Sequence, residues 1–286
     1  MPLQVTAINR FPVKSCRGEP LDRATVEPWG LQGDRRWMIV DDQGEPITAR
    51  EVHRMLLIEP KLIDGGLQLN SPDAPPLAVA TPNGSTLVQV KVWDGDPFDA
   101  APAGSEADAW VSKVVGTSAR LVYLDDPTRR RTNPARTLPG DRVSFADGYP
   151  LLLASEESLA ALNDYIAGGP HAAEGPLPMQ RFRPSVVVRG APAWAEDGWR
   201  RIRIGAVQLR AVKGCDRCVM TMLDPVTAAR GKEPIATLAR YRRWDGKTWF
   251  AVNLVPDTQG SAAVEISVGD EVDVLSAVDP ASGPLR

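Results

Sequence analysis

Short runs of alternating hydrophobic and polar residues fill the first hundred positions, and this pattern predicts a β-rich half. Val88, Val90 and Val92 alternate with more polar neighbours, which is the spacing of a strand with one buried face. Apolar runs also flank residues 41–44 (DDQG), whose composition predicts the turn of a hairpin. Residues 3–8 (LQVTAI) suit an opening strand. The first half is therefore expected to consist mainly of strands and turns.

Three stretches instead repeat their hydrophobic residues at helical spacing. Residues 105–115 predict a helix with Ser105 as its N-cap, because acidic residues fill the first turn and the apolar residues share one face. Residues 155–166 predict a second, capped amphipathic helix. A third helix is predicted over residues 232–243, where Pro234 stands near the first turn and basic residues fill the last one.

The second half mixes these helices with strands. Strand patterns occupy residues 185–189, 201–204 and 207–211. The last two predict a hairpin across Gly205-Ala206. Further strands are expected over residues 249–255 and 264–275.

Polar segments without periodicity divide the chain. Residues 125–141 are charged and rich in proline, which predicts a long loop at a domain junction, and residues 167–180 predict a flexible loop. We therefore expect the following segments: an N-terminal domain (1–124), a junction (125–141), a second domain (142–278) and a flexible tail (279–286).

The composition narrows the range of functions. With 33 Lys and Arg against 36 Asp and Glu, the net charge of −3 argues against a general binder of nucleic acid or membrane surfaces. The first residues lack the apolar core of a signal peptide, and no run approaches the roughly 20 apolar residues of a membrane span. Three cysteines are too few for a disulfide framework and indicate a reducing compartment. We expect a soluble, cytoplasmic monomer that binds neither nucleic acid nor membranes.

Cys215 and Cys218 form a C-x-x-C pair whose spacing alone leaves several explanations open. A structural zinc site needs four Cys or His ligands, and the chain has no second pair and only two histidines. Covalent haem attachment needs a histidine where Val219 stands. A thioredoxin-like pair expects a helix to follow, and the downstream residues do not open one. On spacing alone, two half-buried thiols are favoured.

Basic residues in short clusters shift this balance toward a metal site. They occur at Lys14-Ser15, at Arg35-Arg36 and at residues 181–184 (RFRP). Each cluster alone is typical of a solvated surface. A metal held on an anionic organic ligand would use them differently, because Arg and Lys would bind its phosphate and a thiolate would bind the metal. Arg217, between the two cysteines, would favour the thiolate form.

Five segments together resemble one protein family. They are FPVKSCRGEPL (11–21), GLQGDRRWMIVDDQGEPITAR (30–50), VSFADGYPLLLASEESLAALN (143–163), RFRPSVVVRG (181–190) and the run 195–225, which ends in CDRCVMTMLDP (215–225). In order and content they resemble the MOSC-domain molybdenum enzymes, specifically the amidoxime-reducing components and their bacterial YcbX-type relatives. The resemblance extends from about residue 5 to about residue 275.

The resemblance implies a fold and a cofactor. The fold is mainly β with helices (α+β), in which an N-terminal β-barrel-like domain packs on a MOSC β-barrel domain and the cofactor lies between them. The implied cofactor is molybdenum on a single pterin that has a dithiolene and a phosphate. The second cysteine of the pair, Cys218, is the implied metal ligand, and Cys215 is a neighbour that does not bind the metal.

Further site residues are implied position by position. Asp147 and Asn253 would lie beside the metal and the substrate, and the cofactor would be bound by Lys14, Ser15, Arg35, Arg183, Ser185, Asp216 and Arg217. The chain departs from the family pattern at Ser185, Asp216, Met222 and Ala251.

The implied activity is the reduction of N-hydroxylated compounds such as hydroxylamines, amidoximes and N-hydroxylated bases. Electrons would come from a separate protein of ferredoxin, flavodoxin or cytochrome type, because the clustered cysteines of the YcbX-type ferredoxin-like domain are missing. The alternative is a sulfur-carrier or cofactor-binding module that uses Cys218 as a persulfide, which would not need converging basic clusters. The run Arg129-Arg130-Arg131 is typical of a solvated loop; its alternatives are docking of an acidic electron-transfer partner and lining of the entrance to the site.

Overall fold

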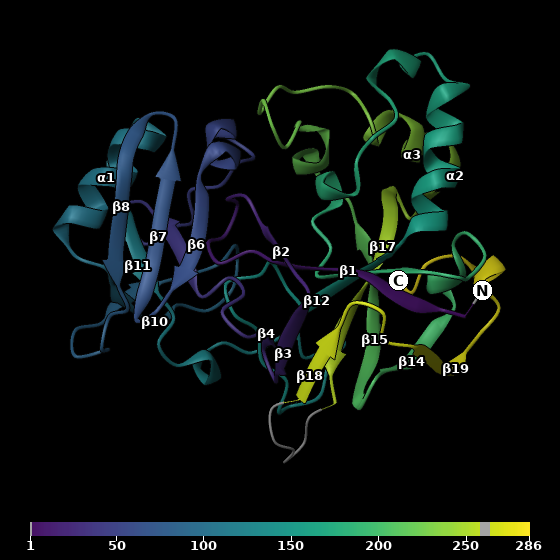
Figure 1. Cartoon of the computed structure of the whole chain (residues 1–286), viewed down its shortest axis with the longest axis horizontal. Coiled ribbons are helices and arrows are strands. Elements are labelled where there is room, and N and C mark those ends of the chain that lie inside the picture. Colours follow the sequence, from purple (N-terminus) through teal and green to yellow (C-terminus); the bar gives the residue numbers. More distant parts are fainter. Residues whose placement is uncertain (1, 258–263) are drawn as a thin grey trace.

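The computed structural model describes residues 2–257 and 264–286 and is mainly β (Figure 1). Its largest sheet has the order β19-β14-β15-β17-β12-β13-β1-β2, and β16 pairs with β17 beside it. The strands of this sheet are β1 (Gln4–Arg10), β2 (Glu19–Leu21), β12 (Leu151–Ser155), β13 (Val186–Arg189), β14 (Trp199–Ile204), β15 (Val207–Asp216), β16 (Arg243–Trp244), β17 (Lys247–Pro256) and β19 (Val272–Ala277). The predicted hairpin across Gly205-Ala206 is confirmed, since β14 and β15 pair from Ile204 and Val207 outward.

Three smaller sheets complete the β structure of the described residues. One contains β5 (Trp37–Val40), β9 (Val88–Val90), β10 (Phe98–Pro102) and β11 (Arg120–Tyr123). A second contains β6 (Glu59–Ile63), β7 (Gly66–Ser71) and β8 (Ala74–Ala80), and a third contains β3 (Arg23–Glu27), β4 (Gly30–Leu31) and β18 (Val264–Ser267). With the helices described below, this confirms the expected α+β class.

The predicted helices are present, with corrections at their ends. They are α1 (Ser105–Val115), α2 (Glu156–Ala167) and α3 (Ile235–Tyr241), so α3 is shorter than expected. Ser155 caps α2 by accepting from the backbone N–H of Ser158 at 3.4 Å. The prediction that Ser105 is an N-cap is wrong, because Gly104 takes that position with φ 101°, a conformation that suits glycine. Within the described part of the chain, no helix has the length and apolar character needed to cross a membrane.

Two lobes, each with its own core, make up the molecule (Figure 1). The first lobe contains α1 with β5 to β11, and its core includes Trp37, Met55 and Val111. The second contains the large sheet with α2 and α3 against it, and its core includes Ile8 and Leu254. The amino-terminal strand therefore lies in the core of the second lobe.

The amino-terminal strands, which the division at residue 124 places in the first domain, lie in sheets of the second lobe. Strand β1 pairs with β13, and β3 pairs with β18, so residues 4–31 belong to sheets that are otherwise built from the second half. The physical reason is burial: Val5 and Ile8 are 1% and 0% exposed, packed in one cluster with Val186 and Val188. The chain first touches the first lobe between β1 and β2, where Val13 and Cys16 pack in its core, and it enters that lobe fully after β4.

Two segments expected to be flexible are packed on the protein. In residues 167–180, Leu177 is buried, and its backbone N–H and C=O both hydrogen bond to the side chain of Asn163, at 2.8 and 3.1 Å. In the tail, residues 279–286, the carbonyl of Leu285 accepts from the N–H of Gly214 at 2.6 Å. Residues 125–141 have one 3₁₀ turn, Pro127–Arg129, and are otherwise irregular, as expected of a loop.

Replacing Ile8 tests whether β1 is an integral strand of the second lobe. Ile8→Ala leaves a cavity in a fully buried position, so we expect the free energy of unfolding to fall by about 2–5 kcal/mol. Urea denaturation followed by circular dichroism measures this. The matched control is Leu275→Ala, since Leu275 is 45% exposed and its change should stay within about 0.5 kcal/mol. Equal, small effects of both variants would contradict the placement of β1.

Candidate functional site

A cavity of about 1130 Å³ is lined by residues from both lobes. The first lobe and the strands leading to it contribute Lys14, Ser15, Arg35, Thr48, Arg50 and Trp93; the second contributes Asp147, Arg183, Lys213, Cys215, Asp216, Arg217, Cys218 and Asn253, among others. Segments far apart in the sequence thus meet around one space that is large enough for an organic cofactor.

All of the predicted site residues line this cavity except Ser185. The Ser185 side chain is fully buried, its Oγ accepts from the N–H of Leu152 at 3.4 Å, and its own N–H donates to the carbonyl of Leu152 at 2.8 Å. Ser185 therefore ties the start of β13 to β12. Its prediction as a cofactor-binding residue is not supported by this position.

The backbone is strained where several of these side chains enter the cavity. Ser15, Arg35, Trp93 and Arg183 all have positive φ, at 67°, 46°, 57° and 55°. Non-glycine residues seldom adopt this region, and such strain persists only where the surrounding structure imposes it. Arg35 is held there by its N–H, which donates to the carbonyl of Phe11 at 2.7 Å. The fold therefore fixes the direction of these side chains before any ligand binds.

Two guanidinium groups share the ring of Phe11. Arg35 and Arg183 each lie 4.3 Å from the ring centroid. Arg35 forms an ion pair with Asp34 at 2.5 Å, whereas the guanidinium of Arg183 has neither an ion pair nor a hydrogen bond among the described residues. Burial, with the charge of Arg35, lowers the pKa of Arg183 to about 10. A half-buried cation without a partner in a cavity wall suits the binding of an anion.

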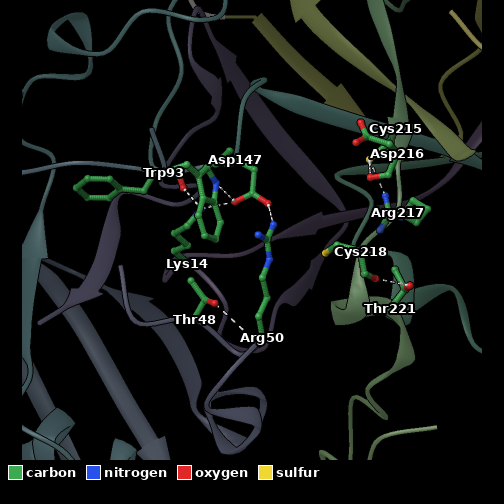
Figure 2. A network of polar contacts seen from close by, with 12 residues as sticks. Lys14, Thr48, Arg50, Trp93, Asp147, Cys215, Asp216, Arg217, Cys218 and Thr221 are labelled. Atoms are coloured by element: carbon green, nitrogen blue, oxygen red, sulfur yellow. Dashed lines mark hydrogen bonds and ion pairs between the residues drawn. The ribbon is translucent and has the colours of Figure 1, made fainter. Parts of the chain in front are cut away.

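A second group of charges surrounds the carboxylate of Asp147 (Figure 2). Lys14 Nζ donates to Asp147 Oδ1 and, at 2.9 Å, to the carbonyl of Phe145. Arg50 Nη2 and Trp93 Nε1 each donate to Asp147 at 3.3 Å. The guanidinium of Arg50 also lies 3.9 Å from the centroid of a Trp93 ring, so cation, aromatic ring and carboxylate hold one another in place.

The pKa values of Lys14 and Asp147 are both lowered, and each group affects the pKa of the other. Burial lowers the pKa of Lys14 to about 8, although the charge and hydrogen bond of Asp147 oppose this. Burial alone would raise the pKa of Asp147, but the charge and hydrogen bond of Lys14 and the charge of Arg50 outweigh it and hold that pKa below its usual range. Asp147 is therefore a carboxylate, and an acceptor of hydrogen bonds, throughout the neutral range.

The two cysteines of the C-x-x-C pair are in different surroundings (Figure 2). Cys218 begins a 3₁₀ turn, Val219–Met222, and its carbonyl accepts from the N–H and Oγ1 of Thr221 at 3.1 and 2.9 Å. Its sulfur faces the side of the cavity where Arg50 and Asp147 lie. Cys215 is instead paired with Arg217, whose Nη1 donates to the sulfur at 2.8 Å, and burial raises the pKa of the Cys215 thiol. Both cysteines are free thiols that line the cavity, and the sulfur of Cys218, unlike that of Cys215, accepts no hydrogen bond from the described residues.

Arg217 and Asn253 join these segments. Arg217 Nη2 donates to the carbonyl of Phe182 at 2.8 Å, which connects the cysteine loop to the segment that carries Arg183. Asn253 Nδ2 donates to the carbonyl of Gly214 at 3.2 Å, and its Oδ1 accepts no hydrogen bond from the described residues. Asp216 forms ion pairs with Lys213 and, at 3.2 Å, with Lys247, so two neighbouring lysines balance the charge of its carboxylate.

Among the cavity residues that sequence reasoning missed are Arg50, Trp93 and Arg130. Arg50 ends the ITAR segment of a motif, and this was the available signal. For Trp93 the sequence contains no signal beyond its place in an alternating strand pattern. Arg130 belongs to the arginine run expected to be solvated, but its guanidinium turns inward and donates to the carbonyls of Ser144, Ala146 and Asp147.

The donors of the site restrict how it could hold a metal. Among residues 2–257 and 264–286, no group of three or more His, Cys, Asp or Glu side chains could hold a metal ion. A metal in this cavity would therefore have to bring most of its ligands with it, and Cys218 could add one thiolate. The cations in the same wall suit a negatively charged carrier.

Comparison with known proteins agrees with this arrangement. Residues 3–118 match the family described as the MOSC N-terminal beta barrel domain, and residues 140–273 match the MOSC domain. Mitochondrial amidoxime-reducing component 1 of Homo sapiens is 31% identical over 284 residues, covering 93% of this chain and 81% of that protein. Its counterpart from Xenopus laevis is 32% identical over 254 residues, 84% of this chain and 72% of that protein.

A relative of another name aligns over a smaller share of its own length. Molybdenum cofactor sulfurase of Oryza sativa subsp. japonica is 31% identical over 269 residues, which cover 88% of this chain but 32% of that protein. The resemblance drawn from the sequence motifs is thereby confirmed. The chain belongs to the MOSC-domain protein family, in the two-domain form that it shares with the amidoxime-reducing components.

Proposed function

We propose that this protein is a molybdenum-cofactor-dependent oxidoreductase that reduces N-hydroxylated compounds such as amidoximes and hydroxylamines. The observation that carries the proposal is one cysteine sulfur, that of Cys218, in a cavity whose wall also holds the buried cation Lys14 and the half-buried cation Arg183. A thiolate and an anion site in one cavity suit a soft metal on an anionic organic carrier. Among the relatives, the name molybdenum cofactor sulfurase contains this cofactor, and the name amidoxime-reducing component contains this reaction.

The residues present fit such a cofactor. Arg183, whose guanidinium has no partner among the described residues, would bind its phosphate together with Lys14 and Arg35. Ser15 and Arg217 would support the pterin from the two sides of the cavity that they line. Cys218 would bind the metal, for which the protein offers no complete set of ligands within the described residues.

The chemistry divides between the cofactor and the protein. When bound, the cofactor supplies a metal centre able to transfer two electrons to an N–O bond. In the overall reaction, one N-hydroxylated molecule takes up two electrons and two protons and gives an amine and water. Asp147, ionised at neutral pH, would accept a hydrogen bond from the substrate and orient it, and Asn253 offers a free Oδ1 for the same purpose.

A separate electron-transfer protein of ferredoxin, flavodoxin or cytochrome type would supply the electrons. The three cysteines of the chain support this, because Cys16 is buried and the other two line the cavity, which leaves none for an iron–sulfur cluster. Cytoplasmic location and a monomeric state stay predictions; the names of the relatives place those proteins in mitochondria.

The alternative function is a sulfur-carrier or cofactor-binding module with a persulfide on Cys218, which the similarity to molybdenum cofactor sulfurases favours. A persulfide alone has no use for Lys14, Arg35 and Arg183 in the same cavity wall, so the reductase is preferred. Mass spectrometry of the intact protein distinguishes the two, since a persulfide adds one sulfur atom to Cys218.

Removal of the Cys218 thiol tests the function directly. Protein produced with the cofactor should contain molybdenum by elemental analysis and should reduce benzamidoxime with dithionite as electron donor. Cys218→Ala should lose most of the metal and of the activity, because it removes the cavity sulfur that accepts no hydrogen bond from the described residues. The control, Cys215→Ala, should keep the metal. Full activity in Cys218→Ala would refute the ligand assignment, and wild-type protein without molybdenum would refute the function.

Replacing Arg183 tests the anion site. Arg183→Ala removes a half-buried charge that has no other partner among the described residues, so we expect cofactor binding to weaken by about 1.5–3 kcal/mol. Pterin and molybdenum content after gel filtration measure the loss. Arg203→Ala is the control, because Arg203 is exposed and paired with Asp273 away from the cavity. Unchanged pterin content in Arg183→Ala would contradict the assignment.

The low pKa of Lys14 predicts a pH limit on cofactor binding. Lys14 is protonated below its pKa of about 8, and its attraction for an anion is lost as the pH rises through that value. A bound anion stabilises the charged amine of Lys14, so in the loaded protein the attraction is lost at a higher pH. Loaded protein should therefore release molybdenum faster at about pH 9 than at about pH 7 during dialysis. Lys14→Gln should release it fast at both values, and a pH-independent wild type would contradict the prediction.

A further inference from the structure

We propose that the surface over α3 and the loop before it docks an acidic electron-transfer protein, an inference that rests on the proposed reductase function. This α3 surface consists of Val226, Arg230, Lys232, Arg240, Tyr241 and Arg243. It lies on the second lobe, on the opposite side of the molecule from α1 (Figure 1).

The positive charges of the α3 surface are not neutralised by neighbours. Arg230, Lys232, Arg240 and Arg243 are exposed, and their side chains form no ion pair or hydrogen bond among the described residues. Residues 226–247 contain six basic and two acidic residues, a net charge of +4 in a chain whose net charge is −3. The surface is thus strongly cationic against an acidic background.

The carboxylates near these cations are already engaged. Glu174 accepts from the backbone N–H groups of Lys232 and Glu233 at 2.9 and 3.0 Å. Glu233 is buried and accepts from the N–H and Oγ1 of Thr237 at 3.0 and 2.9 Å. Asp224 is paired with Arg181 at 3.3 Å. None of them is left to face the α3 surface, so a partner would have to bring the negative charge.

Backbone hydrogen bonds fix this surface to the turn that begins at Cys218. The N–H of Gly231 donates to the carbonyl of Met222 at 2.9 Å, and the N–H of Asp224 donates to that of Ala229 at 2.8 Å. Val219, which directly follows Cys218, is 37% exposed. A protein seated here is separated from the candidate metal ligand by one turn of chain and does not need to enter the cavity.

Exposed apolar groups accompany the charges. Val226 is 68% exposed and Tyr241 is 46% exposed, and the Tyr241 ring is stacked on that of Tyr165 with centroids 4.3 Å apart. A few apolar contacts within a charged surface are typical of small, transient interfaces, where charge complementarity governs the rate of encounter. The arginine run at residues 129–131 is less suited, because Arg129 is bound by Asp125 and Arg130 turns inward.

The number of electrons consumed in each turnover fits a partner that binds weakly and repeatedly. Each turnover breaks one N–O bond and consumes two electrons and two protons, so a one-electron carrier is oxidised and must dock twice. Long-range attraction with fast release serves this purpose, and such attraction is screened by salt.

A binding titration with an acidic plant-type [2Fe–2S] ferredoxin as the probe tests the proposal. At an ionic strength of about 0.01 M, Arg230→Glu/Lys232→Glu/Arg240→Glu should raise the dissociation constant at least about tenfold, and the difference should shrink at about 0.15 M. Arg23→Glu/Lys61→Glu/Lys113→Glu, a reversal of exposed charges on β3, β6 and α1, is the matched control and should bind like wild type. Val226→Ser, which removes an apolar contact and leaves the charge unchanged, should weaken binding without altering its salt dependence.

The outcomes separate this proposal from the proposed function. Equal weakening in both triple variants, or no ferredoxin binding by the wild type at low salt, would overturn the docking surface. Loss of binding to phosphatidylserine vesicles in the first variant, with ferredoxin binding unchanged, would assign the surface to membranes instead and would also overturn it. Dithionite-driven turnover should be the same in all variants; its absence in every protein would count against the reductase function, while the titration still decides the docking surface.

Discussion

The site depends on positive charge that is withdrawn from water where the two lobes meet. Lys14 is 4% exposed and is balanced by Asp147, but the guanidinium of Arg183 has no such partner among the described residues. Even partial burial of a cation without a counter-charge has a cost, which the binding of an anion offsets. The strained backbone at Ser15, Arg35 and Arg183 shows that the fold holds these side chains in place in spite of that cost.

The path of the amino-terminal segment makes this possible. Strand β1 belongs to the second lobe, yet a few residues later Lys14 N–H donates to the carbonyl of Trp37 at 2.9 Å, in the first lobe. On the other side, Phe145 N–H donates to the carbonyl of Arg35 at 2.9 Å. The cations thus sit where the chain crosses between the lobes and is bonded to both. A site held from two sides is preorganised, which favours tight binding of a rigid anionic cofactor.

The two cysteines illustrate how a short motif can contain unlike residues. Both lie within one loop, but Arg217 binds the sulfur of Cys215 and reaches on to Phe182, while the sulfur of Cys218 stays open to the cavity. Under the proposed function, Cys218 is the metal ligand, and Cys215 is a contact that holds Arg217 in position. The turn after Cys218 also connects the cavity to the exposed surface around α3, so the same loop has an inner and an outer face.

Local patterns in the sequence determined the elements whose residues interact with near neighbours. The helix at 105–115, the cap at Ser155 and the hairpin at Gly205-Ala206 all depend on periodicity or turn chemistry within a few residues, and all are present. The family motifs likewise led to the residues around the cavity, since each motif contributes one stretch of its wall. Those motifs did not reveal that the side chain of Ser185 hydrogen bonds to the neighbouring strand β12 instead of lining the cavity.

Only the tertiary structure decided what depends on distant partners. That residues 4–31 join the second lobe, that the carboxyl-terminal residues pack on Gly214, and that Arg130 turns inward each follow from contacts more than ten residues away in the sequence. Trp93 and Arg50 became part of the site for the same reason, because Asp147 is brought to them by the packing of the lobes. The sequence by itself determined which chemical groups the protein has; the packing of the two lobes decided which of them share a cavity, because burial and charge pairing act through space and not along the chain.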